Sequence, residues 1–416
     1  MAEPTTAPDH GRLLGCLLGG AIGGALGAPI ESRSLAEIRA EYGPHGLTEY
    51  AAGEHGKGAV TGETQLMMRT AQAVIQASVR ARARGIGGAL VPMIQETYLD
   101  WLSKGDASVP PPVPGTPPPA VPSPPAVPPP GDASPAFPPP VPSPPALPPL
   151  PPLLDGGRRE VGRSTLEALR KAAARGKPLD PLGTPDEPIN DSKGSGGVVR
   201  VAPCGFGAGS AEGAFDLGCR AAALTHGNPG GYLPGGVHAA LVWGLVRGLE
   251  FGEALRLARE QLKERKHHKE TSKALDAAER LAAQGPATPE QVESLGRGFT
   301  APEALSIAVY VMLRVGDGVP ADHWAFWKRD VIAVREALQR AVNHSGDSDS
   351  TGMLAGNLLG ARYGAAAFPG RWQAEVENRM DIITVAADCA LEFGVDPPTD
   401  EYGSPPMNWM MRYPRA

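Results

Sequence analysis

The sequence predicts an all-α protein: a single compact multi-helix domain interrupted by a disordered proline-rich insertion. Apolar residues recur at helical spacing through most of the chain, whereas the alternating β-branched pattern of strands is nearly absent. Ala, Leu and Gly dominate, and aromatic residues make up only 5% of the 416 residues. Of the 46 prolines, 24 lie within residues 110–152, so the remaining chain has ordinary proline usage and enough length for a large core.

The predicted helical domain covers residues 11–395, between a flexible N-terminal tail (1–10) and a C-terminal tail (396–416). The spacing of apolar residues predicts helices before the insertion at 11–30, 34–41, 64–82 and 91–104. After the insertion, the same criterion predicts helices at 163–174, 212–224, 237–249, 252–264, 273–283, 302–315, 329–342, 351–363 and 372–393.

The insertion itself is predicted over residues 107–154. Proline lacks a backbone donor and has a fixed φ, so an extended polyproline II conformation without a packed core is expected here. The segment Val-Pro-Ser-Pro-Pro-Ala occurs at 121–126 and again at 141–146. Such a sequence could bind an SH3-type or WW-type partner, but a spacer is the preferred interpretation.

Composition narrows the class of protein further. A net charge of −6 without a long basic run gives no direct nucleic-acid signal. Four widely separated cysteines indicate reduced thiols in a cytoplasmic protein. The uncharged stretch 13–30 is just long enough to span a membrane. Because six of its 18 residues are glycine, Pro29 closes it and no basic segment precedes it, we expect a buried helix instead.

Two of the predicted helices carry glycine at every fourth residue, which places the glycines on one helix face. These glycines are Gly15, Gly19, Gly23 and Gly27 in the first helix, and Gly352, Gly356, Gly360 and Gly364 in a late one. Each interior helical glycine costs about 1 kcal/mol relative to alanine. Close helix–helix approach explains this cost, so we expect the two helices to pack together at the centre of the domain.

The strongest polar motif, residues 343–351, immediately precedes the second glycine-faced helix. Asp347 and Asp349 offer hard oxygen ligands one residue apart, and Ser350 adds a hydroxyl group. A divalent-cation site is one interpretation, and a helix N-cap with a solvated turn is the other. An EF-hand is excluded, because its glycine at loop position six and glutamate at position twelve are missing.

Three other polar features lie at helix ends. Residues 61–64, Thr-Gly-Glu-Thr, are compatible with a helix cap that has an acidic first turn. The Ser- and Gly-rich segment 190–197 could present backbone N–H groups to phosphates, although it lacks the Walker spacing, and a flexible connector is the alternative. His226, at the end of a predicted helix, is by itself more typical of a cap than of a ligand.

In their order along the chain, these motifs resemble the ADP-ribosylglycohydrolase family, which includes dinitrogenase reductase activating glycohydrolase. The segments that carry the resemblance are 24–31, 61–65, 190–203, 225–229, 298–308 and 347–350. The resemblance extends over most of residues 11–395 apart from the proline-rich insertion.

This resemblance implies an all-α domain whose cleft holds one or two divalent cations, Mg²⁺ or Mn²⁺, and binds ADP-ribose attached to a protein or small-molecule acceptor. It implies metal ligands at Thr61, Glu63, Asp347, Asp349 and Ser350. Glu31 and Glu63 become the candidate catalytic acid/base groups. The implied substrate-binding residues, which hold the diphosphate, the ribose and the adenine, are Ser192, Gly194, Ser195, Gly196, His226, Gly298 and Phe299.

Two acidic positions of the family pattern are glycine in this sequence. Gly24 and Gly62 stand where the family has aspartate, and each missing carboxylate removes a charge that would hold a cation. Two hypotheses follow. The first is a metal-dependent hydrolase that removes ADP-ribose from a side chain or small acceptor by cleaving an N- or O-glycosidic bond. The second is a catalytically impaired protein that binds ADP-ribose or a related nucleotide on the same fold. The retained motifs favour the hydrolase.

Overall fold

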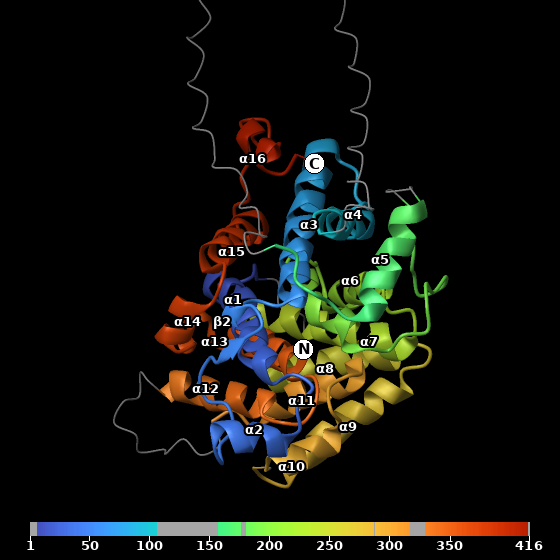
Figure 1. Ribbon diagram of the computed structural model, residues 1–416. Coiled ribbons are helices and arrows are strands. Elements are labelled where there is room, and N and C mark those ends of the chain that lie inside the picture. Colours follow the sequence, from blue (N-terminus) through green and yellow to red (C-terminus); the bar gives the residue numbers. More distant parts are fainter. Residues whose placement is uncertain (1–5, 106–156, 176–179, 287, 317–328, 415–416) are drawn as a thin grey trace, which may run out of the picture.

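In the computed structural model of the protein, the regular secondary structure of the described residues is almost entirely helical, which confirms the all-α prediction (Figure 1). The described residues are 6–105, 157–175, 180–286, 288–316 and 329–414. The predicted insertion at 107–154 lies outside them. Within the described residues, β-structure is limited to one antiparallel hairpin of β1 (Ala52–Gly53) and β2 (Gly56–Lys57) and one isolated bridge.

The elements before the insertion are, besides the hairpin, α1 (His10–Gly27), η1 (Ala28–Ile30), α2 (Leu35–Tyr42), α3 (Gly62–Arg84) and α4 (Leu90–Ser103). Those of the middle segments are α5 (Arg163–Arg175), η2 (Ser195–Arg200), η3 (Ala202–Gly205), α6 (Ala211–Ala223), α7 (Pro229–Val246), α8 (Phe251–Lys263), α9 (Lys269–Ala283), α10 (Pro289–Val292), η4 (Glu293–Leu295) and α11 (Ala301–Leu313). The last are α12 (Arg329–Val342), α13 (Ser348–Tyr363), η6 (Ala365–Ala367), α14 (Gly370–Glu375), α15 (Arg379–Phe393) and α16 (Met407–Arg412).

The glycine faces of α1 and α13 meet in an antiparallel seam at the centre of the domain. A Cβ atom on α1 would collide with the α13 backbone at three facing pairs, Gly15–Gly360, Gly19–Gly356 and Gly23–Gly352. Gly27 extends the seam to the backbone of Ser348, the first residue of α13. The predicted close packing is therefore confirmed, and it fixes where the N-terminus of α13 lies.

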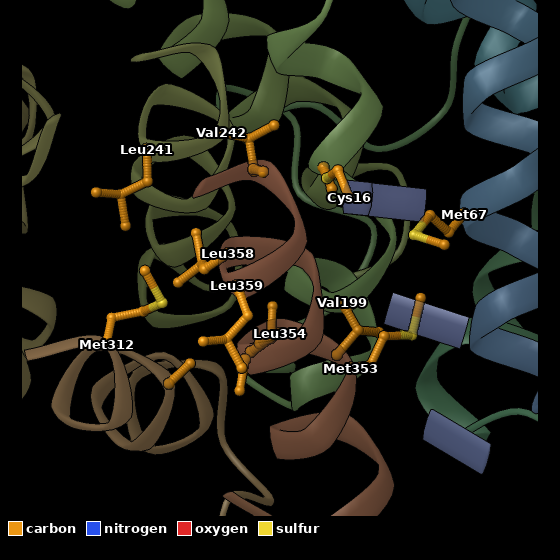
Figure 2. Close-up of a cluster of buried hydrophobic side chains, with 14 of the residues drawn as sticks. Cys16, Met67, Val199, Leu241, Val242, Met312, Met353, Leu354, Leu358 and Leu359 are labelled. Carbon is orange, nitrogen blue, oxygen red and sulfur yellow. The ribbon is translucent and has the colours of Figure 1, made fainter. Parts of the chain in front are cut away.

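The other faces of α13 are buried in the hydrophobic core (Figure 2). Figure 2 shows Leu354 and Leu358 on the side of Leu241 of α7 and Met312 of α11, with Met67 of α3 across the helix. All five side chains are buried. Each fully buried side chain of this size contributes about 1.5–3 kcal/mol to folding, so α13 is firmly held along its length.

By length and composition, the segment His10–Ile30 could cross a membrane, but 83% of its most apolar window is buried inside the protein. It serves as a core helix, as predicted. In the predicted N-terminal tail, Asp9 caps α1, and its backbone N–H donates to the Val246 carbonyl at 2.8 Å. In the predicted C-terminal tail, α16 buries Trp409 against the domain.

Two predicted helices differ from the structure. The predicted helix 237–249 begins eight residues earlier, at Pro229, because Asn228 caps the helix and proline is well accommodated in the first turn. The predicted helix 372–393 is broken into α14 and α15. The Glu377 N–H donates to the Gly58 carbonyl, and its carboxylate accepts from the Val60 N–H at 2.9 Å. These long-range bonds compete with helix continuation, which the apolar spacing alone favoured.

Candidate functional site

A cleft of about 390 Å³ opens where the α1–α13 seam ends. Its walls come from the turn after η1, the first turn of α3, the loop that enters η2, the loop before α11 and the N-terminus of α13. The predicted site residues on its surface are Glu31, Glu63, Gly194, Ser195, Gly196, His226, Phe299, Asp347, Asp349 and Ser350. Folding thus brings together motifs that are far apart in the sequence.

Three carboxylates converge in the cleft. Glu31, Asp347 and Asp349 each place one oxygen so that the three oxygens lie within 4.8 Å of one another. Asp349 is only 6% exposed, and its Oδ1 atom has no hydrogen-bond partner in the protein. The turn carrying Glu31 is held by a bond of 2.7 Å from the Ser32 N–H to the Gly346 carbonyl. The backbone therefore ties Glu31 to the aspartates.

Burial and neighbouring charges raise the pKa values of Glu31, Glu63 and Asp349. Burial, followed by the charge of Asp347, raises the pKa of Glu31. Burial and the charges of Asp347, Glu31 and Glu63 raise the pKa of Asp349 well above its usual value. Burial, with contributions from Asp347 and Glu31, raises the pKa of Glu63 to about 7. The raised pKa values show that these carboxylates repel one another when ionised, and a cation bound between them would relieve that repulsion.

Asp347 has two roles in the local structure. As the N-cap of α13, it accepts a hydrogen bond from the Ser350 N–H at 3.3 Å, so the predicted cap is present, but the turn is buried rather than solvated. Its other oxygen accepts a bond of 2.6 Å from the Ser195 hydroxyl group, and Ser350 Oγ lies 3.4 Å from Ser195 Oγ. Asp347 therefore connects the acidic cluster to the glycine-rich loop.

Thr61 and Glu63 lie on the α3 side of the cluster. Thr61 caps α3, since its Oγ1 accepts from the Thr64 N–H at 3.3 Å. Both residues line a second hollow of about 170 Å³, which shares Glu31 and Asp349 with the main cleft. Glu63, implied above as a metal ligand, is not one of the three carboxylates whose oxygens converge, whereas Glu31 is.

The predicted substrate loop forms part of the opposite wall. A β-bridge joins Gly194 to Thr300, and the Ser195 N–H donates to the Phe299 carbonyl at 3.1 Å. The Phe299 side chain is 46% exposed at the edge of the cleft, as a surface for a planar ligand group requires. Two predicted substrate residues do not line the cleft. Ser192 accepts from the Gly194 N–H within the loop, and Gly298 forms the turn with φ +79°.

His226 lies directly beneath this loop. It is 2% exposed, and Cβ atoms at Gly194, Gly196 and Gly197 would come within 3.2–3.4 Å of its ring. Burial, followed by the charge of Arg200, lowers the pKa of His226 to about 3, so the ring is neutral. Arg200 belongs to none of the motifs predicted to form the site. Its signal was a lone cation in the apolar run of residues 198–202.

A strap, residues 157–164, follows the proline-rich insertion and lines the cleft through Glu160 and the four residues after it, although the sequence motifs did not predict it. Gln65 of α3 holds the strap: its amide donates to the Gly157 carbonyl at 2.8 Å and accepts from the Arg159 N–H at 3.0 Å. No local sequence signal predicts this path, because the contacts are with distant residues.

The strap explains one of the two glycines at acidic family positions. A Cβ atom at Gly62 would collide with the Glu160 carbonyl of the strap and lie 2.5 Å from Val161 Cγ1. A Cβ atom at Gly24 would instead lie 3.4 Å from Thr64 Oγ1 and 3.6 Å from Thr61 Oγ1, which are ordinary contact distances. Position 62 is therefore closed to a side chain, whereas position 24 has room for one.

The residues present fit one divalent cation. Glu31, Asp347 and Asp349 are the oxygen donors that Mg²⁺ and Mn²⁺ prefer. The unpartnered Oδ1 of Asp349 is a buried acceptor that the protein leaves open toward such an ion. Thr61, Glu63 and Ser350 lie beside this group, where they could complete a coordination shell directly or through water.

Comparisons with known proteins identify the family of the chain. The family model described as ADP-ribosylglycohydrolase matches residues 5–398. The chain is 29% identical over 209 residues to the ADP-ribosylhydrolase ARH3 of Homo sapiens, covering 45% of this chain and 54% of that protein. It is 28% identical over 207 residues to the Bos taurus protein of the same name. The matched region thus spans about half the length of these curated relatives.

Among solved structures, one described as an ADP-ribosylglycohydrolase-related protein complex matches with a TM-score of 0.54. The two sequences are 23% identical, and the match covers 91% of this chain and 96% of the other. At this identity, the similarity establishes a shared fold.

Proposed function

The chain belongs to the ADP-ribosylglycohydrolase family, and from that premise we propose that it is a hydrolase that releases ADP-ribose from a modified protein side chain or a small acceptor. The observation that carries this proposal is the convergence of Glu31, Asp347 and Asp349 beside the loop of Gly194–Gly196. The similarity to the ARH3 proteins supports the same activity.

We propose a single Mg²⁺ or Mn²⁺ ion, held by Glu31, Asp347 and Asp349, as the cofactor. When bound, such an ion supplies a Lewis acid that polarises ribose oxygens and lowers the pKa of a water molecule. A second ion is not favoured, because the strap fills the space at Gly62 and Glu63 lies outside the converging group.

The protein residues would divide the remaining work. Backbone groups of Gly194–Gly196 and the Ser195 hydroxyl would hold the diphosphate and ribose, and Phe299 would stack on the adenine ring. A carboxylate, Glu63 or Glu31, would take a proton from the attacking water. The hydroxyl of that water bonds to the anomeric carbon, while the N- or O-glycosidic bond breaks and the leaving acceptor receives a proton.

The alternative is a protein that binds ADP-ribose without cleaving it. The observation that favours it is the loss of two acidic positions, Gly24 and Gly62, of which the second is closed by the strap. If fewer charges hold the water or the ion, binding could persist while the bond-breaking step is lost.

Release of ADP-ribose from mono-ADP-ribosylated arginine and serine peptides, with Mg²⁺, with Mn²⁺ and with EDTA, tests the proposal. Metal-dependent release that Asp347→Ala/Asp349→Ala abolishes would support the hydrolase. No release with either ion, together with ADP-ribose binding that is undiminished in the same variant, would refute the hydrolase and favour the binding protein.

We also propose a cytoplasmic location, because the four cysteines are all free and buried, as expected for a reducing compartment. An SH3-type or WW-type partner of the proline-rich insertion remains a minor part of the proposal, resting on the repeated Val-Pro-Ser-Pro-Pro-Ala segment.

A further inference from the structure

Arg200, at the end of η2, is a fully buried cation beneath the floor of the cleft, at 0% exposure. One guanidinium nitrogen, Nη1, donates to the Gly196 carbonyl at 2.7 Å, and Nη2 donates to the Thr225 hydroxyl. Gly196 lines the cleft, and Thr225 directly precedes His226, which also lines it. Arg200 therefore connects the substrate loop to the histidine below it.

No carboxylate neutralises this cation among the residues that the structure describes. Arg200 forms no ion pair there, and its Nε atom has no hydrogen-bond partner. Its guanidinium instead lies over the ring of Tyr98, 4.9 Å from the centroid, and the Tyr98 hydroxyl is held by Thr70 Oγ1 at 2.6 Å. A buried, unpaired charge is costly to folding. An anionic ligand in the adjacent cleft would offset that cost.

The hydrogen bonds around Thr225 orient His226. The Thr225 hydroxyl group accepts a bond from Arg200 and lies 2.8 Å from His226 Nδ1. When Thr225 donates its one proton in that second contact, Nδ1 is the acceptor and carries no proton. The neutral ring then carries its own proton on Nε2, the nitrogen that faces Gly194 and Gly196. The cleft thereby gains an N–H donor directed toward bound ligand.

We propose that Arg200 is the positioning residue of the anion-binding side of this cleft: it fixes the Gly196 carbonyl and, through Thr225, directs the Nε2–H of His226 toward the diphosphate of a nucleotide-sugar ligand. This inference rests on the proposed function for the identity of the ligand. Burial and the Arg200 charge keep His226 neutral, which is consistent with this arrangement. The buried charge favours ligands that carry a diphosphate over neutral nucleosides.

Binding of ADP-ribose and of adenosine by calorimetry tests the proposal with four variants. We expect Arg200→Met to weaken ADP-ribose binding by about 10-fold to 30-fold and adenosine binding by less than about 3-fold, since a charge-assisted bond to the loop is lost. Arg200→Lys keeps the charge and is expected to recover part of the ADP-ribose affinity. Thr225→Val keeps Arg200 but breaks the relay, so an intermediate loss is expected.

Arg247→Met is the matched control. Like Arg200, Arg247 lies over an aromatic ring, that of Trp243 at 5.1 Å, and donates to backbone carbonyl groups, but its acceptors Gly205 and Phe206 do not line the cleft. Its substitution is expected to lower the melting temperature without changing the ratio of ADP-ribose to adenosine affinity. An equal change of that ratio in Arg200→Met and Arg247→Met would overturn the proposal.

The tautomer of His226 provides a test that does not depend on ligand. Nitrogen chemical shifts of ¹⁵N-histidine protein, assigned by the signal lost in His226→Gln, should show the Nε2–H form in the unmodified protein and a mixture in Thr225→Val. An Nδ1–H form in the unmodified protein would refute the positioning role. If the unmodified protein binds neither ADP-ribose nor ADP, both the proposed function and the proposed preference for anionic ligands are refuted. The His226 tautomer then still tests the positioning role of Arg200 by itself.

Discussion

The glycine seam makes a sharp prediction, because two neighbouring glycines of α1 face different surroundings. Gly23 faces α13, where a Cβ atom would collide with the Gly352 backbone carbonyl and lie 3.1 Å from the Met353 nitrogen. Gly24 faces α3, where the nearest atom to a new Cβ, Thr64 Oγ1, lies at 3.4 Å. Gly23→Ala and Gly24→Ala are therefore matched variants with the same change in helix propensity.

The expected magnitudes follow from these distances. Alanine gains about 1 kcal/mol over glycine inside a helix, and this gain applies to both variants. In Gly24→Ala the methyl group fits, so the free energy of unfolding should stay equal or rise by up to about 1 kcal/mol. In Gly23→Ala the colliding atoms are backbone and cannot rotate away, so α1 and α13 must separate. Overpacking of this kind costs about 1–3 kcal/mol, so after the gain of about 1 kcal/mol in helix propensity we expect a net loss of up to about 2 kcal/mol.

The assay is thermal unfolding together with Mn²⁺ titration by calorimetry. Because the seam ends at Ser348, next to Asp349, separation of the helices should also weaken Mn²⁺ binding in Gly23→Ala. Gly24→Ala should bind Mn²⁺ as the unmodified protein does. If both variants lose the same stability, or if Gly23→Ala unfolds at the temperature of the unmodified protein, the seam does not position the site as argued.

Three other predictions concern the acidic cluster and the insertion. Burial and neighbouring charges raise the Asp349 pKa, so its ionisation removes stability as the pH rises through that value. Asp349→Asn should therefore raise the melting temperature of the metal-free protein by about 2–5 °C at pH 8 and by less at pH 5. The same substitution should abolish the increase in melting temperature that Mn²⁺ binding causes in the unmodified protein. A lower melting temperature at pH 8 would contradict this. Gly24→Asp should fold and should bind Mn²⁺ more tightly than the unmodified protein in calorimetry. Gly62→Asp should have a lower melting temperature, because its side chain collides with the strap. A Gly62→Asp protein that is more stable than Gly24→Asp would show that the strap does not close position 62. Replacing residues 106–156 by a linker of about six residues should change the melting temperature and ADP-ribose release little, because Gly105 and Arg158 are in contact. A large loss of stability would show that the insertion supports the core.

Much of the fold could be predicted because helical spacing and glycine periodicity are local signals. The positions of α1 and α13 followed from apolar residues, and their contact followed from two glycine faces that only close packing explains. The break between α14 and α15 could not be predicted in this way. Glu377 bonds to Gly58 and Val60, more than 300 residues earlier, and such contacts leave no local pattern.

Most of the candidate site could likewise be predicted from polar motifs, because residue types and their spacing can be recognised in the sequence. These motifs are carboxylates, a serine- and glycine-rich loop and a histidine, all at helix ends. Their order pointed to one family, and the cleft brings most of them together. Tertiary structure alone decided which carboxylates converge, because oxygen separations depend on how the seam places α13 against the turn after η1. It also decided that position 62 is closed by a strap and that Arg200 lies buried without an acidic partner among the described residues. Those features arise because segments that are distant in sequence compete for the same space, and local sequence patterns carry no information about such contacts.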